Sequence, residues 1–206
     1  MPEIGLFPLE LVLLPTERVP LHIFEARYKE LIQECLALST EFGLLLEDEE
    51  GRREIGTRAG VIEVLQVFDD GRMNVVVEGR ERFRVVAPTV GRPFATADVE
   101  PVVDEEDVPL PGDVELALDV FKRLAEAAEV EVEVEEPFSE SSPTLSFELA
   151  ARVDFGLELR QEVLELTSER QRLRRLAEIF ERAVEAITVE REVRERASGN
   201  GKVSPR

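Results

Sequence analysis

The chain has 206 residues and a formal net charge of −20, from 25 basic and 45 acidic side chains. This length fits one large domain or two small ones, and the hydrophobic share of 43% excludes a disordered chain. The negative charge argues against broad binding to nucleic-acid phosphates, because that affinity comes from cations. The single cysteine, Cys35, excludes an internal disulfide.

Neither a membrane span nor a signal peptide is expected. No stretch approaches the ~20 apolar residues that a spanning helix needs. Residues Met1–Gly5 carry an acid and no base, unlike the basic start of a signal peptide. We therefore expect a cytoplasmic protein with no membrane partner.

The first half of the chain predicts short strands, because apolar and β-branched runs alternate with Gly, Pro and Asp. The expected strands are Ile4–Pro8, Leu9–Leu14, Val19–Ile23, Phe42–Leu46, Val61–Phe68, Met73–Val77, Arg82–Val86 and Phe94–Val103. Turns are expected at Asp69–Gly71 and Glu78–Glu81. Pro20 lacks an N–H group, so its strand is expected at an edge or at a bulge.

One helix interrupts these strands. Over Glu25–Leu38 the apolar side chains recur at helical spacing and predict one buried stripe. The stripe consists of Phe24, Tyr28, Leu31, Ile32, Cys35 and Leu36. The strands and this helix together suggest a small, partly closed barrel, with a core that includes Leu6, Phe7, Leu13, Ile23, Val64, Val75, Phe83 and Val85.

The second half predicts helices. They are expected at Val114–Ala128, Leu145–Val153 and Leu157–Leu166, and from Ser168 onward, where Ser168–Gln171 forms a capping box. Ser142 is expected to cap the second helix and Gly156 to end it. The acidic stretch Asp104–Asp107 is interpreted as a solvated linker, with a weak cation site as the alternative. The stretch Glu129–Glu136 is interpreted as an exposed helix end or loop.

The residue inventory offers little for catalysis. His22 is the one histidine, and Cys35 lies on the apolar stripe, where a small buried hydrophobe is expected. The single Gly-Lys pair, Gly201-Lys202, does not continue as a phosphate-binding loop does, and no Gly-x-Ser-x-Gly motif occurs. We therefore expect no catalytic residue, no cofactor and no metal site.

A more specific pattern lies in two segments. Pro20-Leu21-His22-Ile23-Phe24-Glu25 with Arg27-Tyr28, and Glu78-Gly79-Arg80-Glu81-Arg82-Phe83, resemble the substrate-binding domain of ATP-dependent Lon proteases. The resemblance covers about 190 residues, including a later match at Leu145-Ser146-Phe147. Its motif residues are Pro20, His22, Phe24, Glu25, Arg27, Tyr28, Glu78, Gly79, Arg82 and Phe83. We interpret them as mainly structural, with Arg80, Arg82 and Arg84 placed to pair with Glu25 or other acids.

The resemblance implies an α+β fold with two parts. An N-terminal, small β-barrel-like (PUA-like) domain with one inserted helix would occupy residues 1–110, and a C-terminal helical bundle residues 111–197. Residues 198–206 are expected to form a disordered tail, in keeping with their glycines and serines.

The resemblance also implies a function. The chain stops at residue 206, so we expect it to lack the ATPase and protease modules of a Lon protease and not to be an enzyme. The implied partners are unfolded or apolar polypeptide segments, together with a protease or chaperone that processes them. Two alternatives remain: an RNA-binding module that uses Arg80, Arg82, Arg84 and Arg92, and an adaptor for one specific protein.

Overall fold

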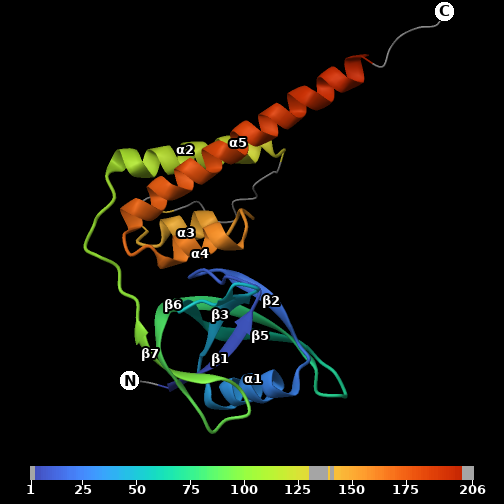
Figure 1. Ribbon diagram of the computed structural model, residues 1–206, viewed down its shortest axis with the longest axis vertical. Coiled ribbons are helices and arrows are strands. Elements are labelled where there is room, and N and C mark those ends of the chain that lie inside the picture. Colours follow the sequence, from blue (N-terminus) through green and yellow to red (C-terminus); the bar gives the residue numbers. More distant parts are fainter. Residues whose placement is uncertain (1–2, 130–138, 140–141, 201–206) are drawn as a thin grey trace, which may run out of the picture.

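The computed structural model describes residues 3–129, 139 and 142–200, with side chains up to residue 194. The strands are β1 (Glu3–Leu9), β2 (Arg18–Ile23), β3 (Phe42–Asp48), β4 (Gly51–Arg52), β5 (Ile55–Val67), β6 (Met73–Thr89) and β7 (Thr96–Pro101). The helices are α1 (Ala26–Leu38), α2 (Pro111–Ala127), α3 (Leu145–Ala150), α4 (Leu157–Glu165) and α5 (Glu169–Asn200). Helices α3 and α4 lie between the β part and the α2–α5 pair, and α5 projects beyond α2 (Figure 1).

The seven strands form one sheet in the order β1-β7-β6-β5-β3-β4, and β2 pairs with β6. Strand β1 pairs antiparallel with β7 through Glu3–Gly5 and parallel with β3 through Leu6–Leu9. The sheet therefore curls back on itself. Helix α1 contributes Tyr28, Leu31, Ile32 and Cys35 to the core that it shares with the sheet.

Strand β6 corrects the predicted turn at Glu78–Glu81, because the strand runs through it without a break. Gly79 serves a close approach instead: a Cβ atom there would lie 2.0 Å from the carbonyl oxygen of Leu14. The Gly79 N–H donates to the Glu17 carbonyl at 2.8 Å, and the Thr16 N–H donates to the Gly79 carbonyl at 2.9 Å. The glycine thus lets a second chain segment pass directly over the strand.

That second segment corrects another prediction. Leu9 ends β1, and the apolar run that follows is an irregular loop rather than a strand. Its side chains Val12, Leu13 and Leu14 are nonetheless almost fully buried. The apolar run therefore indicates that these residues are buried, not that they form a strand. The loop passes closely over β6 at Gly79 instead of pairing along a strand.

Most of the predicted β core is buried, with one exception. Leu6, Phe7, Leu13, Ile23, Val75 and Phe83 are buried, and Val85 is partly buried and packs against the core cluster that contains Phe83. Val64 is 40% exposed, so it was placed wrongly. Phe24 and Leu36, assigned to the stripe of α1, are also exposed. Phe24 precedes the first residue of the helix, Ala26, and Leu36 lies beside the buried face of Tyr28, Leu31, Ile32 and Cys35.

The helical part packs around α5. Its core includes Phe121 of α2, Phe147 of α3, Val163 of α4 and Phe180 of α5. Val12, Leu14, Leu46 and Ile55 from the β part join the same cluster, so the two parts share a continuous core. The predicted stripe of α5, from Leu173 to Ile187, packs on this core.

Several helix ends differ from the predictions. Helix α3 begins after Thr144 rather than Ser142 and ends at Ala150. Gly156, with φ of 87°, precedes α4 instead of ending α3.

At the start of α5, Ser168 caps the helix as predicted, since its Oγ accepts the Gln171 N–H at 3.1 Å. Helix α5 continues to Asn200, past the expected start of the tail, and the predictions for residues 130–136 and 201–206 lie outside the described residues.

Candidate functional site

The corner between β2 and α1 holds the first segment of the family pattern. The His22 Nδ1 atom lies 2.6 Å from Oδ1 of Asn74, and the His22 ring stacks on Phe24 with centroids 5.9 Å apart. The Phe68 ring meets the His22 ring edge-on, with centroids 6.1 Å apart. Phe24 is 60% exposed, so this aromatic group lies at the surface.

The remaining corner residues contact other parts of the corner and of the sheet. Glu25 occupies the N-cap position of α1 but its side chain accepts from Arg27 Nε at 2.9 Å rather than from the helix backbone. Tyr28 is buried against Phe7, with ring centroids 3.9 Å apart, and this burial raises the pKa of the Tyr28 hydroxyl. Pro20 lies on β2, which pairs with β6 and, among the described strands, with no other.

A three-stranded ribbon extends from this corner. We define the distal ribbon as Arg18–Ile23 of β2, Val61–Val67 of β5 and Met73–Glu78 of β6. Its β5 strand exposes four large apolar side chains: Ile62 (41%), Val64 (40%), Leu65 (52%) and Val67 (65%). The register with β6 shifts between Val61 and Glu63 and again between Val64 and Gln66. These bulges interrupt the alternation that would otherwise bury every second residue.

The second segment of the family pattern lies elsewhere. Gly79 and Phe83 are buried in β6, and Arg82 is 5% exposed. Arg82 Nη1 donates to the carbonyls of Leu164 at 2.6 Å and Leu166 at 2.7 Å. The structure therefore does not join this segment to the corner: it builds the junction between the β part and the helices.

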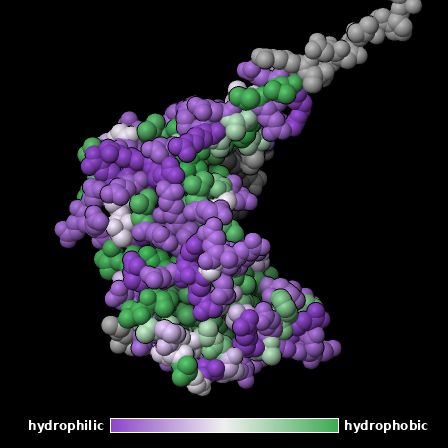
Figure 2. All heavy atoms as spheres, in the orientation of Figure 1, coloured by the Kyte–Doolittle hydropathy of each residue, from purple (hydrophilic) through white to green (hydrophobic). Residues whose placement is uncertain are grey.

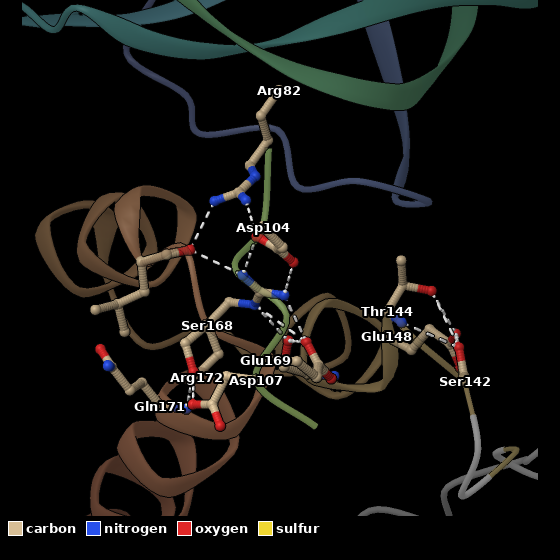
Figure 3. A network of polar contacts seen from close by, with 12 residues as sticks. Arg82, Asp104, Asp107, Ser142, Thr144, Glu148, Ser168, Glu169, Gln171 and Arg172 are labelled. Atoms are coloured by element: carbon tan, nitrogen blue, oxygen red, sulfur yellow. Dashed lines mark hydrogen bonds and ion pairs between the residues drawn. The ribbon is translucent and has the colours of Figure 1, made fainter. Parts of the chain in front are cut away.

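The junction is a network of charged groups around Arg172, which is fully buried (Figure 3). Arg82 and Arg172 point toward Asp104 from opposite sides, and Arg172 donates to Asp104 Oδ1 at 2.9 Å and Oδ2 at 2.5 Å. Arg172 Nη2 also donates to Glu169 at 2.7 Å, and Glu169 accepts from the Ser146 N–H and hydroxyl. Each buried charge thus has a partner.

Burial and neighbouring carboxylates shift the pKa of Arg82 and of Arg172 in opposite directions. Burial lowers the pKa of Arg82, although the Asp104 carboxylate opposes the shift. Burial also acts to lower the pKa of Arg172, but hydrogen bonds and charge from Asp104 and Glu169 outweigh it and leave that pKa raised. Both guanidinium groups remain charged at neutral pH, so the network is a fixed structural device.

Sequence reasoning missed this network. Asp104 was interpreted as part of a solvated linker, but it joins Arg82 and Arg172, and Asp107 accepts from the Ser168 hydroxyl at 2.7 Å. Similarly, Arg160 of α4 donates to Glu17 at 2.6 Å and to the Val12 carbonyl at 3.1 Å. The sequence held one signal for the pairs Arg172–Asp104 and Arg160–Glu17. In each pair, the arginine lies on the predicted apolar face of a helix, where a charge needs a buried partner.

An open cleft of about 790 Å³ lies beside the junction. Its lining mixes Glu78, Glu81 and Asp104 with Arg80 and Phe147. The space-filling view shows the outline hollowed on one side where the helical and β parts meet (Figure 2). The cleft has no concentrated apolar lining, in contrast to the exposed strand of the distal ribbon.

The arginines proposed as a basic cluster do not form one. Arg80 lies 2.9 Å from Glu78, Arg84 lies 3.5 Å from Glu54, and Arg92 pairs with Glu34. Arg82 is buried in the junction. None of these four arginines pairs with Glu25. Each pairs with a different acid, as the alternative prediction allowed.

The described residues offer neither a metal site nor a membrane-spanning helix. Within residues 3–129, 139 and 142–200, no three His, Cys, Asp or Glu side chains converge as a metal site would require. No helix in the same part of the chain is long and apolar enough to cross a membrane.

Comparisons with solved structures agree with this fold. The Lon N-terminal domain protein from Xanthomonas campestris is 25% identical, with a TM-score of 0.66 over 85% of this chain and 97% of that one. The N-terminal domain of the Lon protease of the Mycobacterium avium complex has a TM-score of 0.65 over 87% of this chain and 98% of that one. At 19% identity, the second likeness concerns the fold alone.

Sequence comparisons point the same way. The Lon protease of Anaeromyxobacter dehalogenans is 28% identical over 148 residues, which are 68% of this chain and 17% of that protein. The Lon protease of Paraburkholderia phytofirmans is 25% identical over 205 residues, 91% of this chain and 25% of that protein. The chain therefore spans at most a quarter of the length of these relatives. The model of the ATP-dependent protease La (LON) substrate-binding domain matches residues 3–182, and the chain belongs to this family.

Proposed function

We propose that this chain binds polypeptide segments with exposed apolar side chains and that it recognises them without chemical change. The observation that carries the proposal is the exposed apolar strand of the distal ribbon, Ile62–Val67. The same ribbon carries His22, on which the exposed ring of Phe24 stacks. Burying such side chains against a ligand releases about 25 cal/mol per Å² of apolar surface. An exposed apolar surface of this kind typically marks an interaction site.

The family supports the same role, since its model describes a substrate-binding domain. In this proposal the β part, residues 1–110, is a small PUA-like barrel that displays the ribbon, and residues 111–197 form the bundle that supports it. The chain hands its ligand to a separate protease or chaperone in the cytoplasm. Unfolded chains are the natural ligands, because they display the apolar residues that folding hides.

The chemistry of the potential nucleophiles supports binding without catalysis. Cys35 is buried and burial raises the pKa of its thiol, which disfavours the reactive thiolate. His22 is engaged with Asn74 and with the rings of Phe24 and Phe68. Neither side chain is arranged as a nucleophile with its base.

The test is fluorescence anisotropy with a permanently unfolded model polypeptide and a single-stranded RNA, each over a series of salt concentrations. We expect the polypeptide to bind in the micromolar range or more weakly, since ordering a flexible segment costs conformational entropy. Its affinity should change little with salt, whereas phosphate binding weakens steeply.

Tight RNA binding with a steep salt dependence, and no polypeptide binding, would overturn the proposal in favour of a nucleic-acid module. Binding of neither ligand would also contradict it and would favour an adaptor for one specific protein.

A further inference from the structure

The outer edge of β5 is open along the distal ribbon. Strand β3 pairs with β5 only as far as Ala59, which lies opposite Phe42. From Val61 to Val67, β6 is the one strand that pairs with β5 among the residues that the structure describes. The opposite side of this segment therefore presents backbone N–H and C=O groups that no neighbouring strand engages.

The side chains on this edge differ from those of an edge that avoids partners. Natural edge strands are usually blunted by charges or proline, and β2 follows this rule with Arg18 and Pro20. Strand β5 carries the charge of Glu63 and two bulges, but no proline interrupts it and it exposes four large apolar side chains, Ile62, Val64, Leu65 and Val67. Of the two edges of the ribbon, β5 is thus the one suited to pair with another strand.

Charge adds a preference for the partner. Glu63 on β5 and Asp69 just beyond it are exposed, and within the described part of the chain neither carboxylate forms an ion pair. The chain as a whole carries a charge of −20. An incoming segment with Lys or Arg beside its apolar residues complements both features.

We propose that the edge of β5 from Val61 to Val67 binds an extended, apolar and basic polypeptide segment as an added β-strand. This inference rests on the proposed function and specifies how the ligand is held. Main-chain hydrogen bonds supply affinity that is independent of sequence, and alternate apolar side chains add the rest. Such a mode suits a domain that accepts many unfolded chains.

The test is residue-resolved amide hydrogen exchange of the full chain, with and without a synthetic peptide of alternating valine and threonine flanked by lysines. The outward-facing amides of residues 61–67 should slow by about tenfold or more at saturation, because hydrogen-bonded amides exchange only through opening. Amides of Arg18–Ile23 on the opposite edge should not change.

Two N-methylated peptides sharpen the test, one methylated at odd and one at even positions. An added strand pairs through every second residue, so one peptide should lose binding and the other should keep it. Leu65→Lys should weaken binding of the unmethylated peptide, and the matched variant Val90→Lys, at a 95% exposed valine outside the ribbon, should not.

The possible failures separate the two proposals. Binding without protection of residues 61–67, or equal loss with both methylated peptides, would overturn strand addition and leave polypeptide binding intact. Protection of the β5 edge in a dimer of the chain without peptide would also overturn strand addition by a ligand, because a second copy would then occupy the edge. Absence of binding by any polypeptide would remove the proposed function itself.

Discussion

The distal ribbon and the Arg172 junction both reverse the usual distribution of side chains. In the junction, charged groups are buried, and in the ribbon, large apolar groups are exposed. In the junction, the buried charge of Arg172 is compensated within the chain, because Asp104, Glu169 and Ser146 accept its hydrogen bonds. In the ribbon, no described residue covers the exposed apolar side chains. Unusual placement of side chains therefore does not by itself mark a functional surface, whereas side chains left without a partner do.

The two segments of the family pattern differ in the same way, since the motif residues of one are mostly buried and those of the other lie mainly at the surface. Gly79, Arg82 and Phe83 complete the junction and the core, where each has a steric or polar reason to be present. Phe24 and His22 lie at the surface beside the ribbon. Substitutions in the first group should therefore change stability, and substitutions at the ribbon should change binding.

The largest effect is expected from Arg172→Met. Loss of the guanidinium leaves the Glu169 carboxylate buried with less compensation, and breaking a buried pair in this way costs about 3–5 kcal/mol of unfolding free energy. Urea unfolding measures the loss. The matched control is Arg194→Met, which removes an exposed pair with Glu190 and should cost under about 1 kcal/mol. Equal losses in the two variants would show that the junction network is not a structural device.

A similar loss is expected from Phe83→Ala. The Phe83 ring is fully buried in the β core, and truncation of such a ring costs about 3–5 kcal/mol. Val86→Ala is the control on the same strand, since Val86 is 45% exposed. A cost below about 1 kcal/mol for Phe83→Ala in urea would contradict the register of β6, because a shift by one residue would exchange the two faces.

A smaller effect is expected from Gly79→Ala. The added methyl group would lie against the Leu14 backbone, and relief of that contact by moving the loop should cost about 1–3 kcal/mol. Gly112→Ala is the matched control, because no atom lies within 4 Å of its Cβ position. A Gly79→Ala variant as stable as this control would contradict the close approach of the Leu14 backbone to Gly79.

The sequence predicted what local patterns determine. Helix α1 was predicted to within one residue at its start because its apolar spacing is regular over three turns. The turn at Glu78-Gly79 was wrong because a glycine after an acid fits a turn equally well, and its true neighbour, Leu14, lies 65 residues earlier in the chain. Asp104 was misinterpreted for the same reason, since Arg172 is 68 residues away.

The candidate site was predicted less well than the fold. The corner residues Phe24 and His22 were singled out, but Phe24 was assigned to the buried stripe. Val64 was assigned to the core of the β part, but it is 40% exposed. Register shifts flank it on β5, and such bulges depend on the pairing with β6, which local composition does not reveal.

The most direct test of the central claim separates stability from binding in one variant. Leu65→Ser combined with Val67→Ser removes exposed apolar surface from the ribbon and should change the unfolding free energy by under about 1 kcal/mol. The same variant should lose most of its anisotropy response to the unfolded polypeptide, while Val90→Ser, at an exposed valine elsewhere, binds as the parent does. Undiminished binding by the double variant would contradict the account, because the exposed ribbon would then not be the surface that recognises polypeptides.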